Sequence, residues 1–283
     1  MIMENIFEKL LFDMQLCGMS TVTQKNYVYH IRKFQEYCNK PIEETDAKNV
    51  RKFLHYLREE RKLSIGTVNY YHTCLKFIFQ VTLEKPWNDR KIPRLRGYRV
   101  LPVVLSTEEV RNLLNAVENI KHKAILSTVY SSGLRVSEVC RLKIKDIDSK
   151  NMQIFVRDGK GHKDRYTILS KANLLLLRNY WKSCGQPKEW LFPGNKPGFY
   201  ISPESVRAIL RSACEKAKIT KAVTVHTLRH CFSTHMLENN TNIFVIQKLL
   251  GHASISSTCR YLHLVRPDAF GIVSPLDILE DKK

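Results

Sequence analysis

The sequence predicts a mainly α-helical protein of two domains, with a small antiparallel sheet in the second. Two observations predict the elements: apolar residues recur at helical spacing through most of the 283-residue chain, and one pair of short alternating stretches flanks a glycine-containing turn. A third observation, a change of composition after Trp87, separates the domains. The expected boundaries are 1–88 for the first domain, 89–103 for a linker and 104–283 for the second domain.

The first domain is expected to hold four short helices. Apolar residues recur at three- and four-residue intervals in four separate runs up to about Leu83. Each of the last three runs follows a side chain that can cap a helix, namely Ser20 or Thr21, Thr45 or Asp46, and Ser64. Four such helices make a small bundle.

The expected linker is basic and lacks periodicity. It contains two prolines and several arginines, which is typical of a connection between domains. Its charge favours a strap that follows a phosphate backbone. The alternative is an ordinary solvated linker without a partner, because runs of charge are usually just exposed.

The second domain opens with a helix whose start is marked by Ser106 and Glu109, a capping box in which each side chain satisfies a free backbone amide. The remaining elements that we expect are, in order, a helix over 121–131, strands over 153–157 and 165–169 joined by a turn at 158–161, a helix opened by Ser202-Pro203-Glu204, and a helix that starts close to His226.

Composition favours nucleic acid as the partner. The 46 Lys and Arg residues against 27 Asp and Glu give a formal charge of +19, which attracts polyanions. No apolar run approaches the roughly 18 to 20 residues that span a bilayer, so we expect no membrane partner. The N-terminal residues lack the features of a secretory signal, which predicts a cytoplasmic protein. The eight cysteines have no recurring spacing and are expected to be free thiols.

Four separated segments hold the candidate functional residues: Ser132 to Glu138, Gly159-Lys160-Gly161, His226 to His230, and Leu249 to His252 with Tyr261 nine residues later. Each has an ordinary structural interpretation. Arg135 could pair with Glu138 on a helix surface, Lys160 could be a solvated turn residue, and Tyr261 could belong to the core. His226 and Arg229 could cap a helix, and His252 could end one.

Together these residues fit attack on a phosphodiester, which needs a nucleophile, charge stabilisation and a proton for the leaving oxygen. Arg135 and Arg229 offer planar donors that match two phosphate oxygens, and His226 can add a third. Tyr261 is the candidate nucleophile, with His252 well placed to help accept its proton. Lys160 is the candidate acid, with Lys163 as its competitor. No metal-binding carboxylate cluster stands out, and no cofactor or small-molecule substrate is expected.

This ordered set resembles the tyrosine recombinase (phage integrase) family, whose signature is Arg, Lys, His-x-x-Arg, His and Tyr. The signature matches at Arg135, Lys160, His226, Arg229, His252 and Tyr261. The resemblance implies a SAM-like first domain that clamps DNA and a catalytic second domain, with Glu138 supporting the geometry of the site. It implies cleavage and rejoining of double-stranded DNA through a 3′-phosphotyrosine, in DNA integration or resolution. It also implies monomers that assemble as homotetramers on two DNA sites, at the nucleoid.

Within that family, Xer recombinases and integron integrases are the most similar. The tail over 271–277 is similar to the ending of integron integrases, whereas the stretch over 177–225 is too short for the helical insertion that those enzymes carry. Two other functions compete with recombination: relaxation of DNA by a type IB topoisomerase, and site-specific DNA binding without catalysis. The apolar tail after Tyr261 is expected to dock on a neighbouring protomer, the alternative being its own domain.

Overall fold

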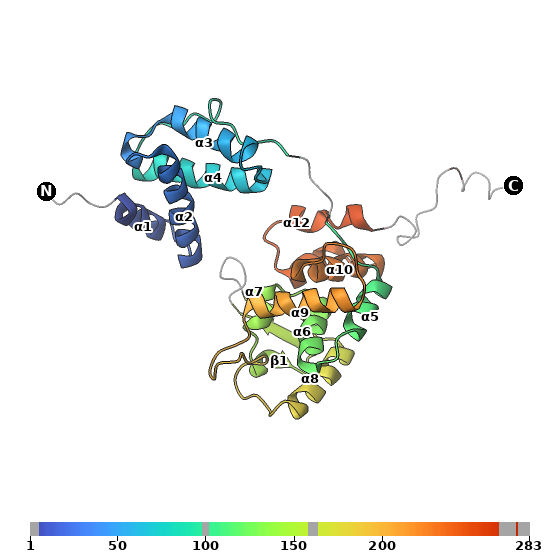
Figure 1. Cartoon of the computed structure of the whole chain (residues 1–283). Coiled ribbons are helices and arrows are strands. Elements are labelled where there is room, and N and C mark those ends of the chain that lie inside the picture. The colour runs from blue at the N-terminus through green and yellow to red at the C-terminus, as the bar shows by residue number, and fades with distance from the viewer. Residues whose placement is uncertain (1–5, 98–101, 158–163, 266–275, 277–283) are drawn as a thin grey trace. The chain divides into compact units, whose positions relative to one another are not determined.

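The computed structural model describes residues 6–97, 102–157 and 164–265, together with Leu276. The chain divides into two compact units, residues 1–99 and 100–283 (Figure 1). Each unit encloses its own cluster of buried apolar side chains. The sequence prediction of a mainly helical fold with a small antiparallel sheet is confirmed.

Four helices form the first unit: α1 (Ile6–Leu16), α2 (Thr21–Cys38), α3 (Ala47–Glu59) and α4 (Ile65–Phe77). A 3₁₀ turn (Ile42–Glu44) precedes α3, and a π-helical turn (Ile78–Thr82) extends α4. Ser20, Asp46 and Ser64 each accept a hydrogen bond from the backbone N–H three residues later, which satisfies an amide without a partner inside the helix. The predicted helix starts are confirmed.

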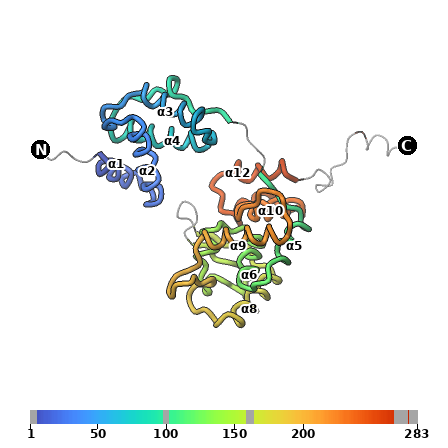
Figure 2. Tube along the Cα trace, in the orientation of Figure 1, coloured from blue at the N-terminus to red at the C-terminus, as the bar shows by residue number. Residues whose placement is uncertain are grey.

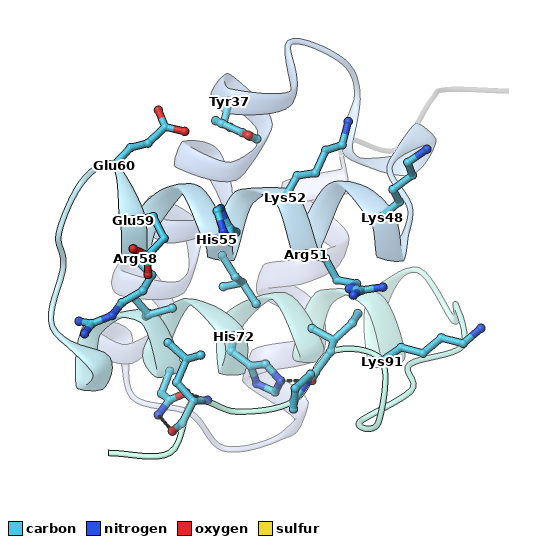
Figure 3. Close-up of a pocket in the computed structure, with 16 residues that line it drawn as sticks. Tyr37, Lys48, Arg51, Lys52, His55, Arg58, Glu59, Glu60, His72 and Lys91 are labelled. Atoms are coloured by element: carbon cyan, nitrogen blue, oxygen red, sulfur yellow. Dashed lines mark hydrogen bonds between the residues drawn. The ribbon is translucent and has the colours of Figure 1, made fainter. Parts of the chain in front are cut away.

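The segment after α4 packs back onto the first unit, beside a cavity of about 640 Å³ between α3 and α4 (Figure 3). Nε2 of His72 donates a hydrogen bond to the carbonyl oxygen of Ile92 at 2.8 Å, and Ile92 is 2% exposed. The side-chain amide of Asn69 bonds both the N–H and the carbonyl of Leu95 at 2.9 Å. The segment over 89–103, expected as a linker, therefore starts as part of the first unit. The division between the units falls inside it, after residue 99.

The second unit opens with α5 (Thr107–Asn115), α6 (Ile120–Ser132) and α7 (Val136–Cys140). A 3₁₀ turn (Ile144–Asp146) leads into an antiparallel sheet of β1 (Ile147–Asp148), β2 (Gln153–Val156) and β3 (Arg165–Ile168), in the order β1-β2-β3. The sequence predicted β2 and β3. The additional strand, β1, has two residues, too few for alternation to reveal it. The turn predicted at 158–161 lies outside the described residues.

The chain then returns to helices: α8 (Lys171–Ser183), α9 (Pro203–Lys216), α10 (Val225–Glu238), α11 (Ile243–Leu250) and α12 (Ser256–Cys259), followed by a 3₁₀ turn (Leu262–Leu264). The predicted cap of α5 by Ser106 and Glu109 and the start of α9 at Pro203 are confirmed. Among the helices in the described ranges, none is both long and apolar enough to cross a membrane.

Helix α10 is the central helix of the second unit. Ten of its 14 residues are buried, and it packs against α6, α9 and α11. The path of the chain from α10 through α11 to α12 can be followed in Figure 2. Gly133 ends α6 with a φ of 62°, and a Cβ atom there would lie 2.5 Å from the Phe232 ring of α10. Only glycine allows this close approach between the end of α6 and α10.

Candidate active site

Glu138 lies at the centre of a cluster of arginines. Its carboxylate accepts hydrogen bonds from the backbone N–H of Arg135 at 2.8 Å and from Nη1 of the same residue at 2.7 Å. The Glu138 side chain is 1% exposed. Burial alone would raise the pKa of Glu138, but the hydrogen bonds and charges of Arg165 and Arg135 lower it to about 2. The ionised carboxylate therefore holds the Arg135 side chain at the start of α7.

Arg165, the first residue of β3, forms a second clamp on the same carboxylate. Its Nη1 and Nη2 each donate to an oxygen of Glu138 at 2.8 Å, and its Nε donates to the carbonyl oxygen of Leu249 in α11 at 2.8 Å. A bidentate pair with this geometry is stronger and more directional than a neutral hydrogen bond. Arg165 thus ties β3, α7 and α11 together.

Arg229 enters the cluster from α10 and is fully buried. Its Nη1 donates to the carbonyl oxygen of Gly133 at 2.6 Å and its Nη2 to that of Leu250 at 2.7 Å. Nη1 also lies 3.9 Å from Glu138, whereas the Nε–H has no partner in the described part of the chain. Burial and the charge of Arg135 lower the pKa of Arg229 to about 9, so the guanidinium stays charged at neutral pH.

His226 and His230 lie one turn apart on α10, with their ring centroids 4.4 Å apart. His226 is exposed at the surface of the unit. Its pKa is nevertheless lowered, first by partial desolvation and then by the charges of Arg229 and Arg135. Burial, followed by the charges of His226 and Arg260, lowers the pKa of His230 to about 4. His230 is therefore neutral at pH 7.

Tyr261 follows α12 and is 1% exposed. Its hydroxyl lies 3.1 Å from Nδ1 of His230. Its ring packs with Phe232 and Leu250 in a small apolar cluster. Tyr261 also interacts electrostatically with the Arg229 guanidinium, which lies close enough for a phenolate to raise the pKa of that arginine. Tyr261 therefore lies beside the arginine cluster.

His252 stands next to Tyr261 without a hydrogen bond to its hydroxyl in the described residues. The two rings are nearly parallel, with centroids 6.3 Å apart, and Nδ1 of His252 lies 2.9 Å from Oγ1 of Thr258. Burial and the charges of Arg229 and Arg135 lower the pKa of His252 to about 3. The sequence suggested His252 as the group that helps accept the tyrosine proton, but His230 makes this contact in the structure.

The structure brings together five of the six candidate residues: Arg135, His226, Arg229, His252 and Tyr261. Lys160 and its competitor Lys163 lie outside the described residues.

Sequence reasoning missed Arg165 and His230. Helical spacing could have indicated His230, which lies one turn after His226. Alternation along β3 could have indicated Arg165, on the same face as buried Thr167. Within the described ranges, no three His, Cys, Asp or Glu side chains are grouped so as to hold a metal ion.

Two family models match the chain. The model of the phage integrase family matches residues 103–266, and the model of the phage integrase N-terminal SAM-like domain matches residues 6–89. Together they cover both units. The two-unit fold thus fits the class of protein that these models describe.

Relatives agree with the family models. A tyrosine recombinase, XerA, from Pyrococcus horikoshii is 35% identical over 91% of this chain and 88% of its own length. An integrase/recombinase from Escherichia coli is 31% identical over 91% of this chain and 88% of its own length. The chain belongs to the phage integrase family.

Solved structures share the fold. The crystal structure of XerA recombinase covers 94% of this chain and 95% of its own, with 29% identity and a TM-score of 0.55. The structure of XerH site-specific recombinase bound to its palindromic difH substrate covers 90% of this chain and 81% of its own, with 21% identity and a TM-score of 0.73.

Proposed function

We propose that this protein is a site-specific recombinase that cuts and rejoins double-stranded DNA through a 3′-phosphotyrosine at Tyr261. The observation that carries the proposal is the Tyr261 hydroxyl, which lies 3.1 Å from Nδ1 of His230, while Tyr261 interacts electrostatically with the buried Arg229. Membership in the phage integrase family makes the chain an enzyme of DNA cleavage and strand transfer. XerH, a site-specific recombinase that shares its fold, was crystallised with palindromic difH substrate in a post-cleavage complex.

The arginines would bind the scissile phosphate. Arg135 is held by Glu138 while its side chain remains 20% exposed, so part of its guanidinium can meet a ligand. Arg229 has an Nε–H without a partner in the described part of the chain, a donor available to an anionic oxygen. Two fixed guanidinium groups stabilise the charge that develops on the non-bridging oxygens as phosphorus is attacked. His226 would add a third donor.

The remaining steps need no cofactor. The tyrosine oxygen displaces the 5′ oxygen of the DNA, which takes a proton from a general acid, and Lys160 is our candidate for that acid. The phosphotyrosine keeps the energy of the broken ester, so a new 5′ hydroxyl can attack it and reverse the step.

Attack also requires an opening of the site. A nucleophile must approach its target to about 3 to 3.5 Å, yet Tyr261 is 1% exposed and Arg229 is fully buried. The segment that carries Tyr261 is short, with a four-residue helix before it and a three-residue 3₁₀ turn after it. We propose that DNA binding shifts this segment so that the phosphate can enter.

Assembly and location follow from the family resemblance. We propose that monomers bind half-sites and that four protomers assemble on two DNA duplexes in the cytoplasm, at the nucleoid. The charge of +19 supports tight, salt-dependent binding of DNA.

A nicked suicide substrate tests the proposal. The short strand released by cleavage diffuses away, so its 5′ hydroxyl cannot reverse the step and the covalent adduct accumulates. The wild-type protein should form a DNA adduct that survives denaturing electrophoresis, and Tyr261→Phe should bind the same DNA without forming it. Tyr130→Phe is the matched control, because Tyr130 also pairs with a histidine of α10, His235, at 2.9 Å. An undiminished adduct from Tyr261→Phe would overturn the assignment.

A further inference from the structure

Helix α10 carries two tyrosine–histidine pairs in different surroundings. Nδ1 of His230 lies 3.1 Å from the hydroxyl of Tyr261, and Nδ1 of His235 lies 2.9 Å from that of Tyr130. Burial raises the pKa of Tyr130, and Cys231 and Glu238 raise it further, so that pair keeps its phenol protonated. The Tyr261 hydroxyl instead lies near the charged guanidinium of Arg229, which interacts electrostatically with Tyr261.

We propose that His230 is a further catalytic residue, whose Nδ1 takes the proton of the Tyr261 hydroxyl as that oxygen attacks phosphorus. This inference rests on the proposed function. It assigns the role of general base to the histidine that contacts the reacting oxygen. The other two histidines of the site have different neighbours: His252 pairs with Thr258, and the His226 ring packs against the His230 ring.

The proton balance of the step is complete. The neutral His230 ring carries its hydrogen on Nε2 and accepts the phenol proton at Nδ1. The oxygen of Tyr261 forms the new bond to phosphorus with the electron pair that it frees, and the bond from phosphorus to the 5′ oxygen breaks. That oxygen takes a proton from the general acid. In the rejoining step, the imidazolium of His230 returns its proton to the departing tyrosine oxygen.

Because charged groups surround His230, its pKa should change when the phosphate of DNA binds beside it. The titratable and charged groups that face it are His226 and Arg229 on α10, and Arg260 and Tyr261 after α12. The free protein keeps the ring neutral, because burial and the nearby charges of Arg260 and Arg229 oppose a further positive charge. A phosphate that binds the arginines neutralises part of their charge and raises the pKa of His230 toward neutrality, where a general base works best.

Two substitutions separate proton transfer from hydrogen bonding. The amide oxygen of asparagine stands as many bonds from the backbone as Nδ1 of histidine, so His230→Asn keeps an acceptor for the tyrosine hydroxyl but cannot take its proton. His230→Ala removes both. His235→Asn is the control for the loss of a buried histidine from α10. Single-turnover adduct formation on the suicide substrate would be measured from pH 6 to pH 9, with half-site binding measured by gel shift.

We expect both His230 variants to bind DNA normally and to form adduct about 10²- to 10⁴-fold more slowly at pH 7. Their rates should rise steeply toward pH 9, because solvent hydroxide becomes abundant enough to take the tyrosine proton in place of the missing base. His235→Asn should keep the wild-type profile. The inference would be overturned if His230→Asn formed adduct at the wild-type rate, or if His230→Ala formed it faster than the wild-type protein. Absence of adduct from the wild-type protein would instead overturn the proposed function.

Discussion

Single residues show where local sequence patterns stop being informative. The spacing of His226 and Arg229 indicates that both side chains project from one helix, which the structure confirms. It does not indicate that Arg229 donates to the carbonyls of Gly133 and Leu250, because these contacts join segments far apart in the sequence. His230 and Arg165 were missed for the same reason: their importance comes from tertiary contacts with Tyr261 and Glu138.

Lys160 and Arg135 can be distinguished by changing the leaving group. A 5′-bridging sulfur at the scissile bond leaves without protonation, so Lys160→Ala should recover most of its cleavage rate on that substrate. Arg135→Ala should stay slow, because its proposed task is to stabilise charge on the non-bridging oxygens. Rates of adduct formation on oxygen and sulfur substrates would test this. If both variants respond alike, the two roles are not separate.

At the level of elements, the sequence was most informative where a side chain satisfies the backbone. Ser20, Asp46, Ser64 and Ser106 each cap a helix at a predicted start. The sequence did not reveal β1, which is held by pairing with β2 rather than by its own two residues. Nor did it reveal the packing of Ile92 on α4, which depends on the partner offered by His72. Local sequence signals therefore predict where helices start, whereas features such as β1 and the packing of Ile92 depend on tertiary contacts.

The end of α6 should be sensitive to any side chain. Gly133 and Gly185 both have a positive φ, of 62° and 71°, so alanine at either costs about 1 to 2 kcal/mol in backbone strain. At Gly133 the added methyl would also lie 2.5 Å from the Phe232 ring, whereas at Gly185 nothing lies within 4 Å. Gly133→Ala should therefore lower the free energy of unfolding by about 1 to 3 kcal/mol more than Gly185→Ala. Urea unfolding of the two variants checks this, and equal losses would contradict it.

At the scale of the whole molecule, positive charge favours binding to DNA, and apolar surface favours contact between protomers. The charge of +19 favours binding of one protomer to DNA, whereas assembly of several protomers requires protein surface. The tail carries Val265, Phe270, Ile272, Val273, Leu276, Ile278 and Leu279, of which Val265 and Leu276 are described. Val265 is 8% exposed and packs on its own unit, in the apolar cluster that holds Tyr261, whereas Leu276 is 64% exposed. Burying a few such side chains contributes several kcal/mol, at about 1.5 to 3 each, before the cost of ordering the tail.

Removal of residues 268–283 should therefore weaken synapsis and strand exchange. Binding of one protomer to a half-site should remain nearly intact, because the tail is proposed to dock on a neighbouring protomer. Gel-shift titration on half-sites and a two-site recombination assay on the truncated protein separate these effects. Full recombination after truncation would leave docking between protomers without support.

Identification of the residue that carries the DNA tests the proposed phosphotyrosine chemistry most directly. Wild-type protein trapped on a suicide substrate would be digested with nuclease and protease, and the nucleotide-linked peptide would be sequenced by mass spectrometry. We expect a 3′-phosphonucleotide on Tyr261 and a free 5′ hydroxyl on the released strand. A nucleotide on another residue, or cleaved DNA without any covalent adduct, would contradict that chemistry.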